Sequence, residues 1–203
     1  MWREYNGDHV CVSPLRDNAQ KKTTRYAKRN AAERQAFQAT LAALNEEQLV
    51  WVDECGVDQD LYRLHARSPR GVPVLVDIQD KRFAPRISII AAYHQHQLCA
   101  PLRFEGSTDT TLFNTWIEQG LVPVLQPGQV VIMDNARFHQ SATTRHLIEQ
   151  ADCQLLFQPA YSPDLNKIEH QWAVLKQGIR ATLNPDLSFL DKLDQQLIHM
   201  SNP

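Results

Sequence analysis

Three acidic residues stand at places in the sequence where packing alone gives little reason for a carboxylate. Asp53 lies within the apolar segment LVWVDECG, and Asp134 directly follows the apolar segment VVIM. Glu169 lies in YSPDLNKIEHQW, where a Ser-Pro-Asp-Leu-Asn turn leads into a predicted helix. Moving an ionised acid out of water is costly unless the acid is paired or bound to a metal ion. These three residues are therefore the first candidates for chemistry.

Each acid also has a purely structural interpretation. Ligands bind beyond the carboxyl ends of strands in α/β sheets, which favours a functional Asp134, but an N-cap or turn residue fits as well. Alternation along the strand places Asp53 and Glu54 on opposite faces, and a salt bridge with an arginine would explain either one. Asn166 and Glu169 fit a capping box, with Asn166 as N-cap and Glu169 as the third helical residue.

Together, the three acids predict a site for hard divalent cations. Mg²⁺ takes a few carboxylate oxygens and keeps water or phosphate oxygens as its other ligands. Two such ions ~3.5–4 Å apart hold the attacking and the leaving oxygen of an in-line phosphoryl transfer. We therefore expect Asp53, Asp134 and Glu169 to converge on one spot. Because clustered carboxylates repel one another, we expect Asp134→Ala to leave the fold intact.

The elements that must position these acids follow from hydrophobic periodicity. Helices are predicted over 30–48, 109–125, 141–151, 166–181 and 187–200. Strands are predicted over 49–56, 61–71, 86–94, 98–106, 128–136 and 153–160. Several strands are thus followed by alternating helices and short apolar strands. This order predicts an α/β fold with a mixed sheet covered by helices on both faces.

Composition sets limits on the class of protein. The 203 residues are enough for one good-sized domain and an appendage, and 43% hydrophobic and 22% charged residues are typical of globular proteins. No apolar segment approaches the ~20 residues of a membrane span, and the N-terminus lacks a signal-peptide core. The four cysteines form no Cys-x-x-Cys pair, which is typical of reduced thiols. We expect a cytoplasmic protein without a membrane partner.

Two further groups of residues have open interpretations. The net charge is −2, but residues 21–34 are strongly basic. Such a run is either a solvated face or a contact for nucleic-acid phosphates. The segment His94-Gln95-His96 offers two metal-binding side chains, but no third ligand lies nearby in the sequence.

Three segments resemble the catalytic blocks of DDE transposases, above all the bacterial insertion-sequence members of the mariner-like superfamily (the insertion sequence 630 family). They are VWVDECG, VIMDNARFH and LLFQPAYSPDLNKIEHQWAVLK, in this order. The third block of the family runs close to Leu-Pro-Pro-Tyr-Ser-Pro-Asp-Leu-Asn-Pro-Ile-Glu. In this chain 34 residues separate Asp134 from Glu169, a spacing that the family favours.

The resemblance implies an RNase H-like fold and two Mg²⁺ or Mn²⁺ ions. It implies DNA cleavage and strand transfer in cut-and-paste transposition into TA-containing targets, by a homodimer on the element ends at the nucleoid. Carried over by position, Asp53, Asp134 and Glu169 become the catalytic and metal-binding residues. The residues expected to support them or to contact DNA are Asn135, His139 and Asn166.

This chain departs from the family at two prolines, replaced here by Ala160 and Lys167. Proline is favoured at the start of a helix because its φ is preset, and Lys167 loses that advantage. We expect Lys167 to contact a DNA phosphate instead. The other residues predicted to bind DNA are Lys21, Lys22, Arg25, Lys28 and Arg29.

The resemblance also divides the chain into two parts. Residues 1–48 correspond to a basic lead-in and a linker helix, which in the family follow a helix-turn-helix region, and residues 49–203 correspond to the catalytic domain. Without helix-turn-helix modules we expect weak DNA binding with little sequence preference. Two alternatives to a transposase domain stay open: a stand-alone RNase H-fold nuclease, and an inactive DNA-binding or dimerisation remnant.

Overall fold

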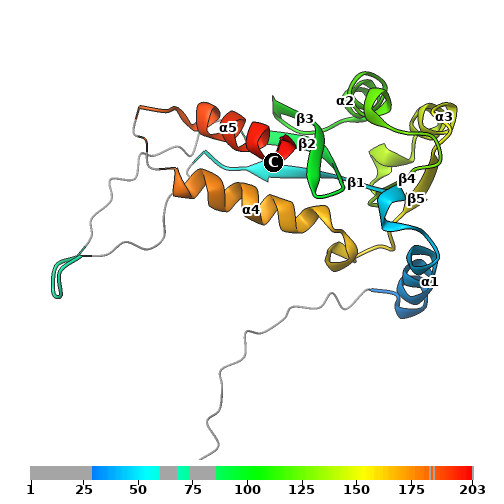
Figure 1. Cartoon of the computed structure of the whole chain (residues 1–203), viewed down its shortest axis with the longest axis horizontal. Coiled ribbons are helices and arrows are strands. Elements are labelled where there is room, and N and C mark those ends of the chain that lie inside the picture. The colour runs from blue at the N-terminus through cyan, green and yellow to red at the C-terminus, as the bar shows by residue number, and fades with distance from the viewer. Residues whose placement is uncertain (1–28, 60–67, 74–85, 183, 185, 203) are drawn as a thin grey trace, which may run out of the picture.

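The computed structural model describes residues 29–59, 68–73, 86–182, 184 and 186–202 (Figure 1). Its strands are β1 (Leu49–Val57), β2 (Ile87–His94), β3 (Gln97–Glu105), β4 (Val130–Met133) and β5 (Gln154–Phe157). Its α-helices are α1 (Ala31–Ala42), α2 (Thr110–Trp116), α3 (Ala142–Gln150), α4 (Ile168–Ala181) and α5 (Phe189–Ser201). Short 3-10 turns include η1 (Glu46–Gln48), η4 (Arg137–Gln140) and η5 (Pro163–Leu165).

The strands form one mixed sheet in the order β3-β2-β1-β4-β5, which confirms the predicted α/β class. β1 lies at the centre, antiparallel to β2 and parallel to β4, and β5 continues the parallel half. The register pairs Trp51 with Ile132. Asp53 and Asp134 each lie two residues further along their chain segments. They therefore lie at the same level of the sheet, where β4 ends.

Helices cover both faces of the sheet, and each face has its own core. The core under α4 and α5 includes Leu49, Trp51, Cys55, Ile168, Trp172, Leu175, Ile179, Leu193 and Leu197. The core under α2 and α3 includes Val50, Val52, Phe113, Trp116 and Ile148. Figure 1 shows α4 and α5 together in one part of the molecule and α2 and α3 together in another. Successive residues of β1 thus alternate between the two cores, as strand geometry predicts.

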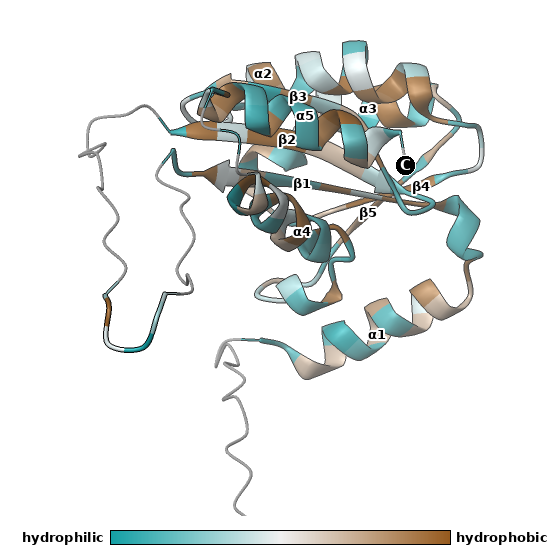
Figure 2. Ribbon diagram, turned by 60° about the vertical axis from the view of Figure 1, so that its left-hand side comes forward, coloured by the Kyte–Doolittle hydropathy of each residue, from teal (hydrophilic) through white to brown (hydrophobic). Residues whose placement is uncertain are grey.

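The segment before β1 is tied to the loop that leads into α4. Arg34 of α1 donates two hydrogen bonds to Asp164, at 2.9 and 2.6 Å. Glu46 of η1 forms an ion pair with Lys167, with Nζ and Oε1 2.5 Å apart. Figure 2 shows α1 set apart from the strands, with the turn of η1 leading from it to β1. Two ion pairs therefore hold this arm to residues 164–167.

The predicted helix over 30–48 is two elements. α1 ends at Ala42, and Asn45 begins η1 with a capping box in which Gln48 is the reciprocal partner. The hydrophobic stripe persists across the break, since Phe37 is buried and Leu41 and Leu44 pack against the core. Capping at Asn45 therefore overrides the continuous periodicity of the sequence.

Other predicted elements differ from the structure in extent. Residues 109–125 are helical, but α2 gives way to a π turn at Ile117–Leu121 and a 3-10 turn at Val122–Val124, where Pro123 has no N–H to donate. β4 ends at Met133, short of the predicted 136. The strand predicted over 61–71 lies mostly outside the described residues, and 69–71 form a bend and a turn. No helix in the described ranges is long and apolar enough to cross a bilayer.

Candidate active site

A pocket of about 440 Å³ opens at the edge of the sheet where β4 and β5 end. Asp53, Asp134 and Glu169 all line it, together with Asn135, Asn166 and residues of the segment 158–163. Asp53 belongs to β1, Asp134 directly follows β4, and Glu169 lies in the first turn of α4. The fold thus brings three acids from distant parts of the sequence to the wall of one pocket.

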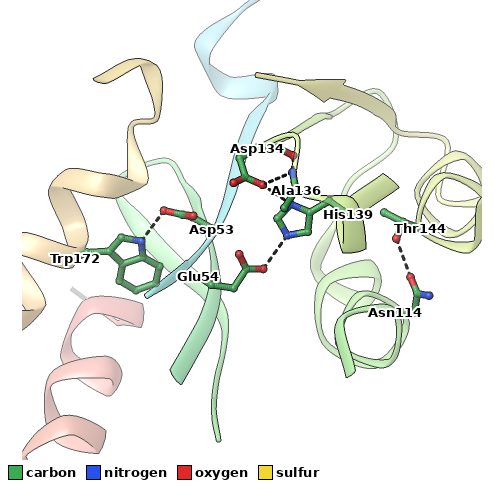
Figure 3. Close-up of polar contacts among 8 residues, drawn as sticks. All are labelled: Asp53, Glu54, Asn114, Asp134, Ala136, His139, Thr144 and Trp172. Atoms are coloured by element: carbon green, nitrogen blue, oxygen red, sulfur yellow. Dashed lines mark hydrogen bonds and ion pairs between the residues drawn. The ribbon is translucent and has the colours of Figure 1, made fainter. Parts of the chain in front are cut away.

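Asp53 faces α4 and is held by a tryptophan from that helix (Figure 3). The indole Nε1–H of Trp172 donates a hydrogen bond to Asp53 Oδ2 at 3.0 Å. Burial raises the pKa of Asp53 to about 7; the Trp172 hydrogen bond opposes the shift, and the nearby charges of Glu169 and Glu54 add to it. The surrounding protein therefore does not stabilise a negative charge on Asp53.

Asp134 contacts the buried side chain of His139, which also contacts Glu54 of β1 (Figure 3). His139 is fully buried, with Nε2 2.8 Å from Glu54 Oε1 and Nδ1 2.6 Å from Asp134 Oδ1. Because both ring nitrogens face carboxylates, both carry protons and the ring is an imidazolium. Burial disfavours this charge, but the two carboxylates raise the pKa of His139 to about 9.

The ionised state of Asp134 follows from these contacts. Burial acts to raise its pKa, but hydrogen bonds from His139 and from the backbone N–H of Ala136, at 3.0 Å, hold the pKa below its usual value. The bond to Ala136 makes Asp134 a turn residue as well as a pocket residue, so both interpretations of the sequence apply. Neither Asp53 nor Glu54 has an arginine partner among the described residues, which rules out the salt bridges considered for them within that part of the chain.

Aromatic rings and a hydroxyl contact surround the imidazolium. The ring centroids of Phe113 and Phe138 each lie 4.3 Å from that of His139, and aromatic faces stabilise a nearby cation. Close by, Asn114 of α2 accepts a hydrogen bond from the Thr144 hydroxyl of α3 at 2.7 Å, which fixes these two helices against each other (Figure 3). Groups from several elements therefore fix the histidine that positions Asp134.

Glu169 is exposed in the first turn of α4, and the predicted capping box is wrong. α4 begins at Ile168, and its N-cap is Lys167, whose side chain makes no capping bond. Only the backbone carbonyl of Asn166 takes part, accepting from the Glu169 N–H at 3.3 Å. The η5 turn delays the helix by one residue, so the Glu169 carboxylate is not used for capping.

The donor chemistry of the pocket fits a divalent cation. Carboxylate oxygens are the ligands that Mg²⁺ and Mn²⁺ prefer, and Asp53 has a raised pKa that a cation would reverse. Within the part of the chain that the structure describes, no three His, Cys, Asp or Glu side chains are gathered tightly enough to be a metal centre as they stand. The fit is therefore in ligand type and charge, through Asp53, Asp134 and Glu169.

The predicted supporting residues lie in different environments. Asn135 is exposed on the pocket wall, and its carbonyl and Oδ1 accept hydrogen bonds from Gln140 at 3.0 and 2.6 Å. His139 has no exposed surface, so it contacts Asp134 and is out of reach of DNA. Asn166 lines the pocket, is 7% exposed, and has a buried Oδ1 without a hydrogen-bond partner among the described residues. Sequence reasoning did not assign Glu54 a role beside these residues.

The predicted DNA-binding residues are only partly described. Lys21, Lys22, Arg25 and Lys28 lie outside the described residues. Arg29 is exposed just before α1. Lys167 is paired with Glu46, but its side chain remains 46% exposed. The two described cations therefore lie on the surface near the loop that precedes α4.

The histidines of the segment 94–96 line a second pocket, of about 730 Å³. His94 is already used in packing, since Nδ1 lies 3.0 Å from the Leu49 carbonyl and Nε2 lies 3.2 Å from Gln129 Nε2. This places His94 as a link between the edges of β2, β1 and the start of β4. His96 and His170 line the same pocket.

Comparison with known proteins places this architecture. The sequence pattern of the DDE superfamily endonucleases matches residues 48–193. The solved Mos1 strand transfer complex is similar, with a TM-score of 0.66 and 17% identity over 90% of this chain and 59% of that chain. The Mos1 mariner paired end complex with Mn has a TM-score of 0.64 and 16% identity, over 91% of this chain and 61% of that chain. The catalytic domain of Mos1 mariner transposase has a TM-score of 0.60 and 14% identity, over 88% of this chain and 85% of that chain. No curated protein matches the chain in sequence.

These similarities establish the fold and the family. The sheet and its helices have the RNase H-like fold of the Mos1 catalytic domain. The chain spans 59% and 61% of the two Mos1 chains in the DNA complexes. The matched region, 48–193, runs from the start of β1 into α5 and contains the whole acidic pocket. The chain belongs to the DDE superfamily of endonucleases.

Proposed function

We propose that this chain is the catalytic domain of a transposase that cuts DNA and joins the released end to a target. The observation that carries the proposal is the single pocket lined by Asp53, Asp134 and Glu169. Membership of the DDE superfamily and the fold shared with Mos1 support it. The sequence resemblance to the insertion sequence 630 family supports a bacterial element, cut-and-paste movement and TA-containing targets.

The three carboxylates would hold Mg²⁺ or Mn²⁺, two ions by analogy with the family. When bound, such ions stabilise charge on the attacking and leaving oxygens of a phosphoryl transfer. A paired end complex of Mos1 with Mn has the same fold, which supports this choice. Without a cation the pocket repels phosphate, so we expect DNA to enter it only in the presence of divalent metal.

The other residues of the site hold the acids in place. The Trp172 indole fixes one oxygen of Asp53, and the His139 imidazolium fixes one oxygen of Asp134. The two contacts of the Asp134 carboxylate, with His139 and with the Ala136 N–H, both involve Oδ1. Preorganised carboxylates avoid the cost of ordering side chains at the moment of reaction. We assign His139 this positioning role, and we assign Asn135 and Asn166 to contacts with DNA in the pocket.

DNA is the proposed partner of the surface around the pocket. The exposed cations Arg29 and Lys167, with the basic residues 21–28, would contact phosphates outside the site. We propose that the active complex is a homodimer on two element ends, acting at the nucleoid in the cytoplasm. Backbone contacts of this kind orient DNA without reading its sequence.

Nicking of supercoiled plasmid in Mn²⁺ or Mg²⁺ tests the catalytic proposal. Glu169→Gln removes one carboxylate that is exposed and makes no capping bond, so the fold should stay intact while nicking is lost. Glu118→Gln, an exposed glutamate on the π turn after α2, is the matched control and should nick like the wild type. Undiminished nicking by Glu169→Gln, or nicking by the wild type in a metal chelator, would disprove the assignment.

Strand joining separates the transposase from the alternatives. The substrate is a duplex with a free 3′-OH, mixed with plasmid target and divalent metal. Joined products support a transposase. Cleavage without joining would assign a stand-alone nuclease, and neither activity would assign an inactive remnant.

A further inference from the structure

Arg137 is an exposed cation beside the acidic pocket that the catalytic proposal leaves unused. It is the first residue of η4 and directly follows residues 134–136, all of which line the pocket. Three other arginines are held in ion pairs with acids of the chain: Arg34 with Asp164, Arg103 with Asp194 and Arg145 with Glu149. Within the described residues Arg137 forms no such pair.

The backbone that carries Arg137 is fixed on both sides of this residue. Before it, the Ala136 N–H donates to Asp134 Oδ1 at 3.0 Å. After it, the fully buried side chain of His139 contacts Asp134 and Glu54, and the His139 N–H donates to the Ala136 carbonyl at 3.1 Å. A ligand that binds Arg137 therefore orders only one side chain and no loop, which lowers the entropic cost of binding.

The wall of the pocket contains no permanent positive charge. Its described lining residues include three acids, Asp53, Asp134 and Glu169, and no lysine or arginine. A DNA strand carries a phosphate every ~3.4 Å of helix axis, so a strand with one phosphate in the pocket brings the next ones over the surrounding surface. Bound divalent ions would serve the phosphate in the pocket, and its neighbours on the strand would need cations outside the wall.

The guanidinium group of Arg137 matches such a phosphate in charge and shape. Its planar set of N–H donors can bind two oxygens of one phosphate, and the charges make these hydrogen bonds stronger than neutral ones. No acid among the described residues, including those of the pocket, occupies this group. Lys167, which also follows a pocket residue, is by contrast already paired with Glu46.

We propose that Arg137 binds the DNA phosphate next to the one held in the acidic pocket, and so sets the register of the strand across the site. The inference rests on the proposed function of the pocket. It adds a substrate contact on η4, whereas the DNA contacts proposed above lie in the basic segment 21–29 and at the start of α4.

Fluorescence anisotropy with a short labelled duplex in Mg²⁺, over a salt series, tests this contact. All proteins carry Glu169→Gln so that the DNA stays uncut. Adding Arg137→Ala should weaken binding about 10-fold at low salt and reduce the log–log salt slope by ~0.9. Arg137→Lys should keep the slope, because the charge remains, but recover only part of the affinity, because the two-oxygen geometry is lost.

Arg145→Ala is the matched control, since it removes the same charge from an exposed arginine that is already paired within α3. It should leave the salt slope unchanged. An unchanged slope in Arg137→Ala would overturn the inference, because Arg137 would then be only solvated. An equal reduction by Arg145→Ala would also overturn it, because the effect would then be one of net charge.

Plasmid nicking in otherwise wild-type chains separates a binding role from a structural one. Arg137→Ala should raise KM for DNA about 10-fold and leave kcat and the unfolding temperature unchanged. A lower unfolding temperature together with a lower kcat would make Arg137 a structural residue and overturn the inference. A wild-type protein that binds DNA through Arg137 but does not nick it would instead remove the proposed function and leave this contact standing.

Discussion

His139 carries a positive charge inside the protein because two acids from different elements share it. Glu54 reaches it from β1 and Asp134 from the end of β4. Burial opposes the charge of the imidazolium, and the two carboxylates together offset that cost. The contact of His139 with Glu54 ties η4 to β1, and its contact with Asp134 fixes the position of that carboxylate in the pocket.

The charge on His139 gives the protein a pH dependence at alkaline pH. Its pKa is raised from 6.5 to about 9, so its contribution to stability is complete below pH 6.5 and is lost as the pH rises through 9. The loss is on the order of 3 kcal/mol for this shift. His139→Gln should therefore flatten the decline in unfolding free energy between pH 6.5 and about 9 in urea titrations. Parallel declines in both proteins would contradict the imidazolium assignment.

Asp53 changes the stability with pH in the opposite direction to most carboxyl groups. Its pKa is raised to about 7, so the folded state binds a proton more tightly than the unfolded state, and stability falls as the pH rises from about 4 to 7. Asp53→Asn should stabilise the metal-free protein by roughly 1–4 kcal/mol at pH 8 and have little effect at pH 4. Unfolding in a metal chelator measures this, with the exposed Asp58→Asn as control. If Asp53→Asn changed the unfolding free energy equally at pH 4 and pH 8, the raised pKa of Asp53 would be excluded as the cause.

The structure changes the expectation for Asp134→Ala. Relief of clustered negative charge would leave the fold intact, but this carboxylate is half of the support of a buried imidazolium. Its removal leaves His139 with Glu54 alone and should lower the unfolding free energy by about 1–3 kcal/mol, less than for a fully buried pair because Asp134 is half exposed. Urea unfolding beside Glu169→Gln checks this. Equal stability of the two variants would show that His139 does not depend on Asp134.

At the scale of elements, two ion pairs hold α1 and η1 to the loop before α4. The Arg34–Asp164 pair is bidentate, but Asp164 is 64% exposed, so the pair contributes less than about 1 kcal/mol. Arg34→Ala should therefore change global stability little, yet increase amide hydrogen exchange in 163–169. Arg145→Ala, which removes an exposed pair within α3, is the control. Unchanged exchange in that loop would show that α1 does not restrain it.

Local patterns predicted the elements well, but not the contacts between them. Alternation along β1 correctly separated Asp53 from Glu54, because strand geometry is local. The partners of these acids, Trp172 and His139, lie 119 and 85 residues away, and no pattern within one segment reports such distances.

The capping box at Asn166 failed for a related reason. The motif has the right residues at the right spacing, but the η5 turn places Asn166 outside the helix and its side chain in the pocket. Tertiary structure outweighs local capping preference there.

At the scale of the whole molecule, the strongest positive charge lies in the segment before the catalytic core. If residues 21–34 bind phosphates, DNA affinity should fall steeply with salt, and removing one cation–phosphate pair should reduce the log–log slope by ~0.9. Replacing Lys21, Lys22 and Arg25 with alanine should therefore reduce the slope by roughly 3. Fluorescence anisotropy over a salt series measures it. An unchanged slope would return this run to a solvated face.

The central place of β1 has a consequence for how the protein is made. In the chain, β1 precedes both strands that flank it: β2 is the next of the described strands, whereas β4, His139 and α4 come only after residue 129. Both faces of β1 contribute to the cores, so this strand stays partly uncovered on the nascent chain until β4 and α4 have been made. Glu169, in the first turn of α4, is the last of the pocket residues in the chain, so a chain truncated before α4 would have two of the three acids and an incomplete pocket. The pocket of the proposed active site is thus complete only once α4 has been made.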